Sequence, residues 1–156
     1  MSTLSIRIWL EIDHQTAFRA GGWAYVLAEG SALSGTAGGD RAPSAEPIAL
    51  AGLIEALKGA PAGSSVEVRS ASLAAATVFR RLADPANPPE NDLELWAQLA
   101  VAMKGHAVRF APAAVQPRTP AAFAAAWAEL ARDKAKTRPF RAAIPKVNLA
   151  KAGVPA

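Results

Sequence analysis

A strict alternation of apolar and polar side chains from Leu4 to Asp13 is the feature that most constrains the fold. The apolar positions are Leu4, Ile6, Ile8, Leu10 and Ile12, and the positions between them are Ser5, Arg7, Trp9, Glu11 and Asp13. Side chains two residues apart point to the same face of a β-strand. The segment therefore predicts a strand that buries one face in a core and carries Trp9 and Glu11 on the other.

Two further strands follow at short intervals. Gly21-Gly22 ends a turn, residues 23–29 have a strand-like composition, and Gly30-Ser31 marks a second turn before a weaker strand over residues 32–37. Consecutive strands joined by short turns pair antiparallel. The first quarter of the chain is thus predicted to be a three-stranded meander.

After Pro43-Ser44 the spacing of apolar residues changes from strand-like to helical. Apolar residues then recur at helical spacing near residues 48–58, and a fourth strand is expected at 66–71. Ser72 is suited to cap the helix that follows this strand. Another amphipathic helix begins near Asp92, and a fifth strand at 107–111 and a last helix come after it. The order βββαβααβα indicates an α/β layered domain.

Composition narrows the chemistry and the setting. The 156 residues suit one domain, and the absence of cysteine excludes disulfides, thiolate zinc sites and cysteine nucleophiles. No uninterrupted apolar run reaches about 18 residues, and the N-terminus lacks the pattern of a secretory signal. We therefore expect a soluble, cytoplasmic chain with no membrane partner.

The net charge of +4 is concentrated at the C-terminus. Residues 137–156 contain no acid and carry Arg138, Arg141, Lys146 and Lys151. Three prolines in the same stretch favour an extended tail over a packed element. The expected division is a domain over residues 1–136 and a basic tail over 137–156, which is the main electrostatic attraction for nucleic acid.

Five short motifs, in order, resemble the ribonuclease H family. They are Glu11 ten residues before Gly21-Gly22-Trp23, the helix Ala49-Leu50-Ala51-Gly52-Leu53-Ile54-Glu55-Ala56-Leu57, the strand end Ser70-Ala71-Ser72, the pair Leu95-Trp96, and Ala128-Glu129-Leu130-Ala131. The resemblance spans residues 4–136. It implies a ribonuclease H-like fold, with a five-stranded mixed sheet of one antiparallel meander plus two parallel strands, and helices on both faces.

The resemblance also implies a loss of chemistry. The family's four metal-binding carboxylates align with Glu11, Ala49, Ala71 and Ala128, so only the first position keeps an acid. Family members cleave the RNA strand of an RNA–DNA hybrid with two divalent metals about 4 Å apart. A single glutamate cannot place two ions, and the chain is expected to be catalytically inactive and to need no cofactor.

Neighbouring acidic residues are candidates to replace the missing metal ligands. Glu11, Asp13 and Glu46 are the candidates for a rebuilt centre holding one Mg²⁺ or Mn²⁺. However, Asp13 lies two residues beyond Glu11, about 7 Å along a strand. Pro47 also suggests that the helix begins only after Glu46. We favour the interpretation that these are solvated strand-end and cap carboxylates.

Several residues are candidates for contact with nucleic acid, each with a structural alternative. Trp9 can stack on a base, although packing under a helix is favoured. Gly21-Gly22 can bring the backbone close to a ligand, although a turn with positive φ suffices to explain them. The remaining candidates are Ser44, Ser72, Arg138, Arg141 and Lys146.

Three functions remain open from the sequence. The first is an inactive ribonuclease H-like module that binds nucleic acid through its groove and basic tail. The second is a protein-interaction or structural component of a larger assembly, docked by the tail. The third is an active hybrid ribonuclease that uses relocated carboxylates.

Overall fold

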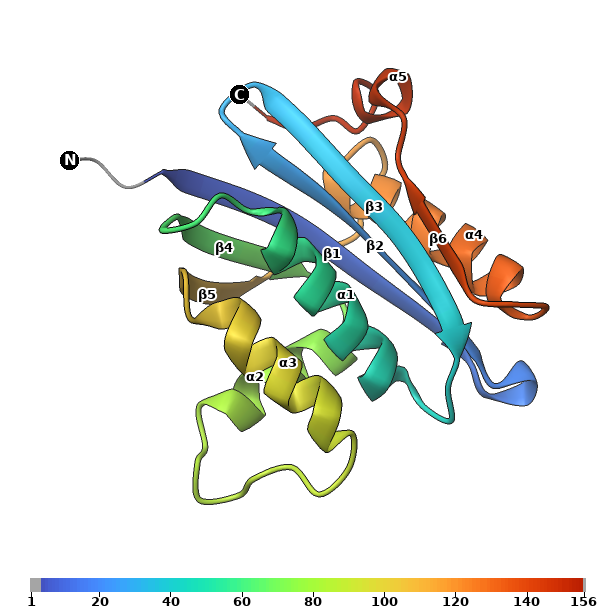
Figure 1. Ribbon diagram of the computed structural model, residues 1–156. Coiled ribbons are helices and arrows are strands. Elements are labelled where there is room, and N and C mark those ends of the chain that lie inside the picture. Colours follow the sequence, from blue (N-terminus) through green and yellow to red (C-terminus); the bar gives the residue numbers. More distant parts are fainter. Residues whose placement is uncertain (1–3, 156) are drawn as a thin grey trace.

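The computed structural model describes residues 4–155, which form one layered α/β unit (Figure 1). The strands are β1 (Ser5–Gln15), β2 (Ala20–Glu29), β3 (Ala32–Arg41), β4 (Ser65–Ser70), β5 (Ala107–Pro112) and β6 (Phe140–Ala143). The helices are α1 (Ala45–Gly59), α2 (Leu73–Leu82), α3 (Leu93–Met103), α4 (Pro120–Ala135) and α5 (Lys146–Leu149), with a short 3₁₀ turn at Thr16–Phe18.

The strands form one mixed sheet in the order β5-β4-β1-β2-β3-β6. β1, β2 and β3 pair antiparallel as the predicted meander, and β4 and β5 extend it in parallel from β1. The expected sheet of five strands has a sixth, because β6 pairs antiparallel with β3. The predicted fold class is confirmed with this one addition.

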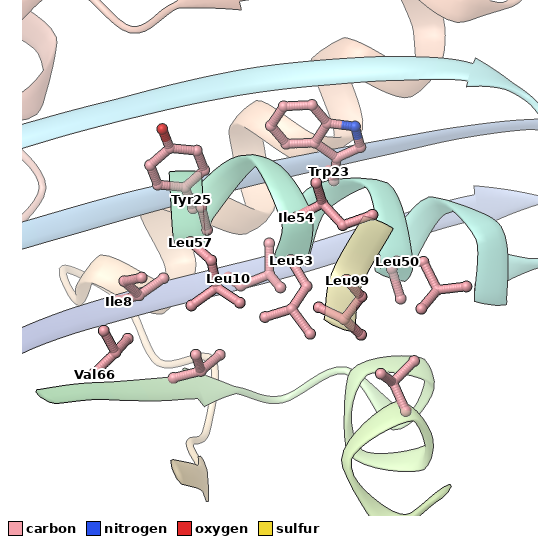
Figure 2. Packing of buried hydrophobic residues seen from close by; sticks show 14 of the residues in the cluster. Ile8, Leu10, Trp23, Tyr25, Leu50, Leu53, Ile54, Leu57, Val66 and Leu99 are labelled. Atoms are coloured by element: carbon pink, nitrogen blue, oxygen red, sulfur yellow. The ribbon is translucent and has the colours of Figure 1, made fainter. Parts of the chain in front are cut away.

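The main core lies between the sheet and α1. Ile6, Ile8 and Leu10 of β1 are buried there, as the alternation predicts. Figure 2 shows Leu53 and Leu57 of α1 beside Ile8 and Leu10. The helices α2 and α3 pack against α1 on this side of the sheet. Burial of these apolar side chains is the dominant stabilising contribution to the fold.

The opposite face of the sheet is covered by α4, which packs on β1, β2 and β3 (Figure 1). The contact is close because the helix presents alanines. Its buried face is Pro120, Ala121, Ala124, Ala128, Ala131 and Ala135. A Cβ atom on Gly22 would overlap the backbone of Ala128 and Arg132, and one on Gly39 would lie 2.7 Å from the carbonyl oxygen of Ala131.

This close approach corrects the prediction for Gly21-Gly22. Both glycines lie inside β2, and neither has the positive φ expected of a turn. A Cβ on Gly21 would overlap Ile48 of α1, while Gly22 faces α4 on the other side. The two glycines are therefore required by the helices that pack on each face of the strand.

The C-terminal segment packs on the same sheet. The stretch predicted to be an extended tail contains β6 and α5. Ile144, Leu149 and Ala152 are buried against Trp9 and Val26 on the α4 side of the sheet. The apolar residues between the basic side chains dock this segment on the sheet. Within residues 4–155, no helix is both long and apolar enough to cross a membrane.

Candidate functional site

Glu11 is a buried carboxylate at the centre of the sheet. It lies on the same face of β1 as Trp9, toward α4, and its residue is only 4% exposed. β4 runs parallel to β1, and the backbone N–H of Ala71, just beyond the end of β4, donates a 2.9 Å hydrogen bond to Glu11 Oε2. Burial raises the pKa of Glu11 to about 7, and the hydrogen bond from Ala71 only partly opposes this.

The structure brings together some of the four aligned positions. Ala71 contacts Glu11 directly through its backbone. Ala128 of α4 packs against Ala24 of β2, which is paired with Glu11. Ala49 of α1 is buried in the main core, on the opposite side of the sheet from Trp9 and Glu11. The methyl groups at these three positions provide no ligand oxygen.

Asp13 and Glu46, the acids proposed to rescue the site, are engaged elsewhere. Arg132 Nη1 of α4 lies 2.8 Å from Asp13 Oδ2. Glu46 is half-buried in the first turn of α1 and lines a hollow with Arg81 and the loop of residues 86–91. In the described part of the chain, no three or more acids and histidines are grouped closely enough to hold a metal ion.

The residues at this site do not fit a two-metal centre. Mg²⁺ requires oxygen ligands in near-octahedral geometry and is usually anchored by one or two carboxylates. Here the one aligned carboxyl is buried, accepts a hydrogen bond from the backbone and has a pKa near 7. No hydrolytic step can be derived through metal ions at such a site.

Of the candidate nucleic-acid contacts, Ser72 and Trp9 have structural roles instead. Ser72 caps α2, as predicted, by accepting a hydrogen bond from the N–H of Ala75 at 3.2 Å. Ser44 precedes α1 but forms no side-chain cap. Trp9 is buried against α4 and the C-terminal segment, in agreement with the packing interpretation.

Two of the three basic candidates near the C-terminus have partners within the chain. Arg141 Nη2 lies 2.9 Å from Glu55 Oε2 of α1, and Lys146 Nζ donates a 2.6 Å hydrogen bond to the carbonyl oxygen of Leu33. Arg138 is exposed, beside a small hollow that Lys134 also lines. The ion pair with Glu55 offsets one of the positive charges of this segment.

Sequence reasoning missed a second group of cations. Arg7, Arg69 and Arg109 lie on adjacent strands at positions that face the same side of the sheet as Trp9. Each arginine occupies a polar position in the alternating pattern of its strand. This alternation was the sequence signal that could have identified these residues. Their proximity depends on the parallel pairing of β1, β4 and β5, which a single strand's pattern does not contain.

Solved structures match this chain, whereas no protein-family model and no curated protein does. One match is LC9-RNase H1, described as a type 1 RNase H with the type 2 active-site motif. It has 14% sequence identity and a TM-score of 0.63, with 97% of this chain and 86% of that chain covered.

A second match is the N-terminal RNase H domain of Rv2228c from Mycobacterium tuberculosis, solved as a fusion with maltose-binding protein. It has 18% identity and a TM-score of 0.60, with 86% of this chain and 98% of that chain covered. At such identities the likeness concerns the fold. The chain has a ribonuclease H-like fold, as its motifs predict.

Proposed function

We propose that this chain is a ribonuclease H-like module that binds nucleic acid without hydrolysing it. The observation that carries the proposal is the environment of Glu11. It is the one acid at the four aligned positions, and it is buried beneath α4 with a backbone hydrogen bond to one oxygen. Alanine occupies the other three positions.

The site offers too few ligand oxygens for hydrolysis. Two-metal cleavage needs several carboxylates that clamp both ions on the attacking and leaving oxygens. Asp13, the nearest acid along the strand, is neutralised by Arg132, and Glu46 lines a separate hollow beside Arg81. Relocated acids therefore do not supply what the alanines lack.

Support for nucleic-acid binding comes from the fold and from cations outside the aligned site. The two matched structures are RNases H by description, and their fold is shared with this chain. Arg80 and Arg81 end α2 beside a hollow that Thr77 and Asn87 also line. Arg80 is exposed there, so its guanidinium is free to donate hydrogen bonds to a phosphate oxygen.

Hydrolysis is tested with an end-labelled RNA–DNA hybrid incubated with the protein and either Mg²⁺ or Mn²⁺. The expected result is no cleavage above buffer alone. Glu11→Ala is the matched control, because cleavage that persists in it would come from a contaminating nuclease. Cleavage that this substitution abolishes would contradict the inactive assignment.

Binding is tested by fluorescence anisotropy with labelled single strand, duplex and hybrid at about 50 mM and 200 mM salt. We expect binding to at least one of them that weakens as salt rises, because phosphate contacts release counterions. A protein that ignores all three at the lower salt concentration contradicts nucleic-acid binding. That result would favour the second candidate, a protein-interaction role.

A further inference from the structure

One region of the sheet is left uncovered on the α4 side. α4 packs on β1, β2 and β3, and Figure 1 shows it behind β2, β3 and β6 while β4 and β5 lie at the opposite edge. On this side, β4, β5 and the adjoining part of β1 carry Arg7, Glu67, Arg69 and Arg109 beside the buried Trp9. We call these five residues the arginine face.

The register of the strands aligns these side chains. Arg7 of β1 is paired with Glu67 of β4, which is paired with Arg109 of β5, so the three lie in one row across the sheet. Trp9 and Arg69 form the next row, two residues further along. Neighbouring strands are about 4.8 Å apart, which places the Arg7 and Arg109 backbones about 10 Å from each other.

The arginine face has an excess of positive charge and an ordered arrangement. It holds three guanidinium groups and one carboxylate. Glu67 pairs with Arg69 and Arg109, whereas Arg7 Nη1 donates a 2.8 Å hydrogen bond to the carbonyl oxygen of Pro155. The guanidinium carbons of Arg7 and Arg69 each lie 5.3 Å from the centroid of the Trp9 ring. The Arg109 side chain remains 76% exposed. Arginine binds phosphate in a bidentate manner, and orientation by Trp9 and Glu67 lowers the entropic cost of doing so.

A groove of about 500 Å³ continues from this face. Trp9 and Arg69 line it together with residues 112–114 at and after the end of β5, residues 119–121 at the start of α4, and Gly153 and Pro155. Most of these lining groups are small or apolar. A flat, apolar groove beside a row of cations is suited to a chain with a charged backbone and unpaired, planar bases.

We propose that the arginine face and its groove bind single-stranded nucleic acid, with the arginines on the phosphodiester backbone and the groove receiving bases. This inference rests on the proposed nucleic-acid-binding function and names its surface. The surface lies on the opposite face of the sheet from α1, α2 and α3. A single strand is favoured over a duplex because only unpaired bases are free to enter the groove.

The test compares Arg109→Gln and Arg69→Gln with Lys104→Gln, which removes an exposed cation at the end of α3, on the other face of the sheet. Binding of a labelled single-stranded oligonucleotide is measured across a salt series, and thermal unfolding verifies that each variant is folded. We expect Arg109→Gln and Arg69→Gln to weaken binding roughly three- to tenfold and to reduce the salt slope by about 0.7 for each lost phosphate contact. Lys104→Gln should change affinity less than about twofold.

The outcomes separate this inference from the proposed function. If the wild-type chain binds single strands and all three variants bind equally well, the arginine face is excluded while nucleic-acid binding stands. If the wild-type chain binds no nucleic acid at about 50 mM salt, both fall. Displacement of the oligonucleotide by polyglutamate of equal charge, at equal concentration, would also overturn the assignment, because it would indicate an acidic peptide as partner.

Discussion

Glu11 shows how one residue's surroundings decide its chemistry. An exposed strand-end carboxylate would be ionised at neutral pH and available to a cation. Here α4 and the end of β4 enclose the side chain, and its pKa rises from 4.5 to about 7. The folded protein therefore holds this proton more tightly than the unfolded chain does, and folding becomes linked to pH.

The linkage predicts that the Glu11 contribution to stability falls as pH rises from about 4.5 to about 7. Below this window the carboxyl is neutral in both states, and within it only the unfolded chain releases the proton. Glu11→Gln keeps an oxygen for the Ala71 N–H but does not ionise. Relative to wild type, we expect this variant to gain stability across the window, reaching roughly 3 kcal/mol above pH 7.

The measurement is urea unfolding of both proteins at a series of pH values. Glu90→Gln, which neutralises an exposed loop carboxylate, serves as the control and should track wild type within about 0.5 kcal/mol. If the free energy of unfolding changed with pH in the same way for wild type and Glu11→Gln, Glu11 would not be buried as described.

At the scale of elements, the approach of α4 to the sheet depends on small residues on both sides. Alanines on the helix face Gly22 and Gly39 on the strands, so backbone meets backbone with little side-chain volume between. We expect Gly22→Ala to lower the free energy of unfolding by about 3 kcal/mol or more, because its methyl would overlap the backbone of Ala128 and Arg132.

Gly105→Ala is the matched control for this substitution. Nothing lies within 4 Å of a Cβ built on Gly105, and its φ is not positive. Its free energy of unfolding should change by less than about 1 kcal/mol, measured by the same chemical denaturation. Equal effects at the two glycines would contradict the close packing of α4.

The C-terminal segment makes a second element-scale prediction. Leu149 of α5 is 1% exposed, whereas Val147, two residues earlier, is 68% exposed. Leu149→Ala should lower the free energy of unfolding by about 2–5 kcal/mol, and Val147→Ala by less than about 0.5 kcal/mol. Thermal and urea unfolding measure both. If Leu149→Ala were as mild as Val147→Ala, this segment would not be part of the folded core.

Which elements the sequence could predict depends on how local their signals are. The strand β1 and the Ser72 cap have local patterns and are where they were expected. The third strand was expected to end at residue 37, but Gly38 and Gly39 continue it and leave room for Trp23 and α4. β6 was missed because its four residues lie between prolines and form a strand only through pairing with β3.

At the scale of the whole molecule, the two layers of helices and the mixed sheet were predicted through motifs spaced along residues 4–136. The same motifs located Glu11 and Ala71, which the parallel pairing of β1 and β4 then brings into contact. The burial of Glu11 and the pairing of Asp13 with Arg132 were not predictable in this way. Asp13 and Arg132 are separated by 119 positions and meet only after α4 docks.

We propose that the ribonuclease H-like fold here surrounds a site that does not hold catalytic metal ions. The most direct test is an anomalous diffraction map from crystals soaked in Mn²⁺ at about pH 8, above the pKa of Glu11, so that protonation does not exclude the ion. We predict no Mn²⁺ within about 2.5 Å of a Glu11 carboxylate oxygen. An ordered Mn²⁺ ligated by Glu11, with Asp13 or Glu46 beside it, would contradict the account.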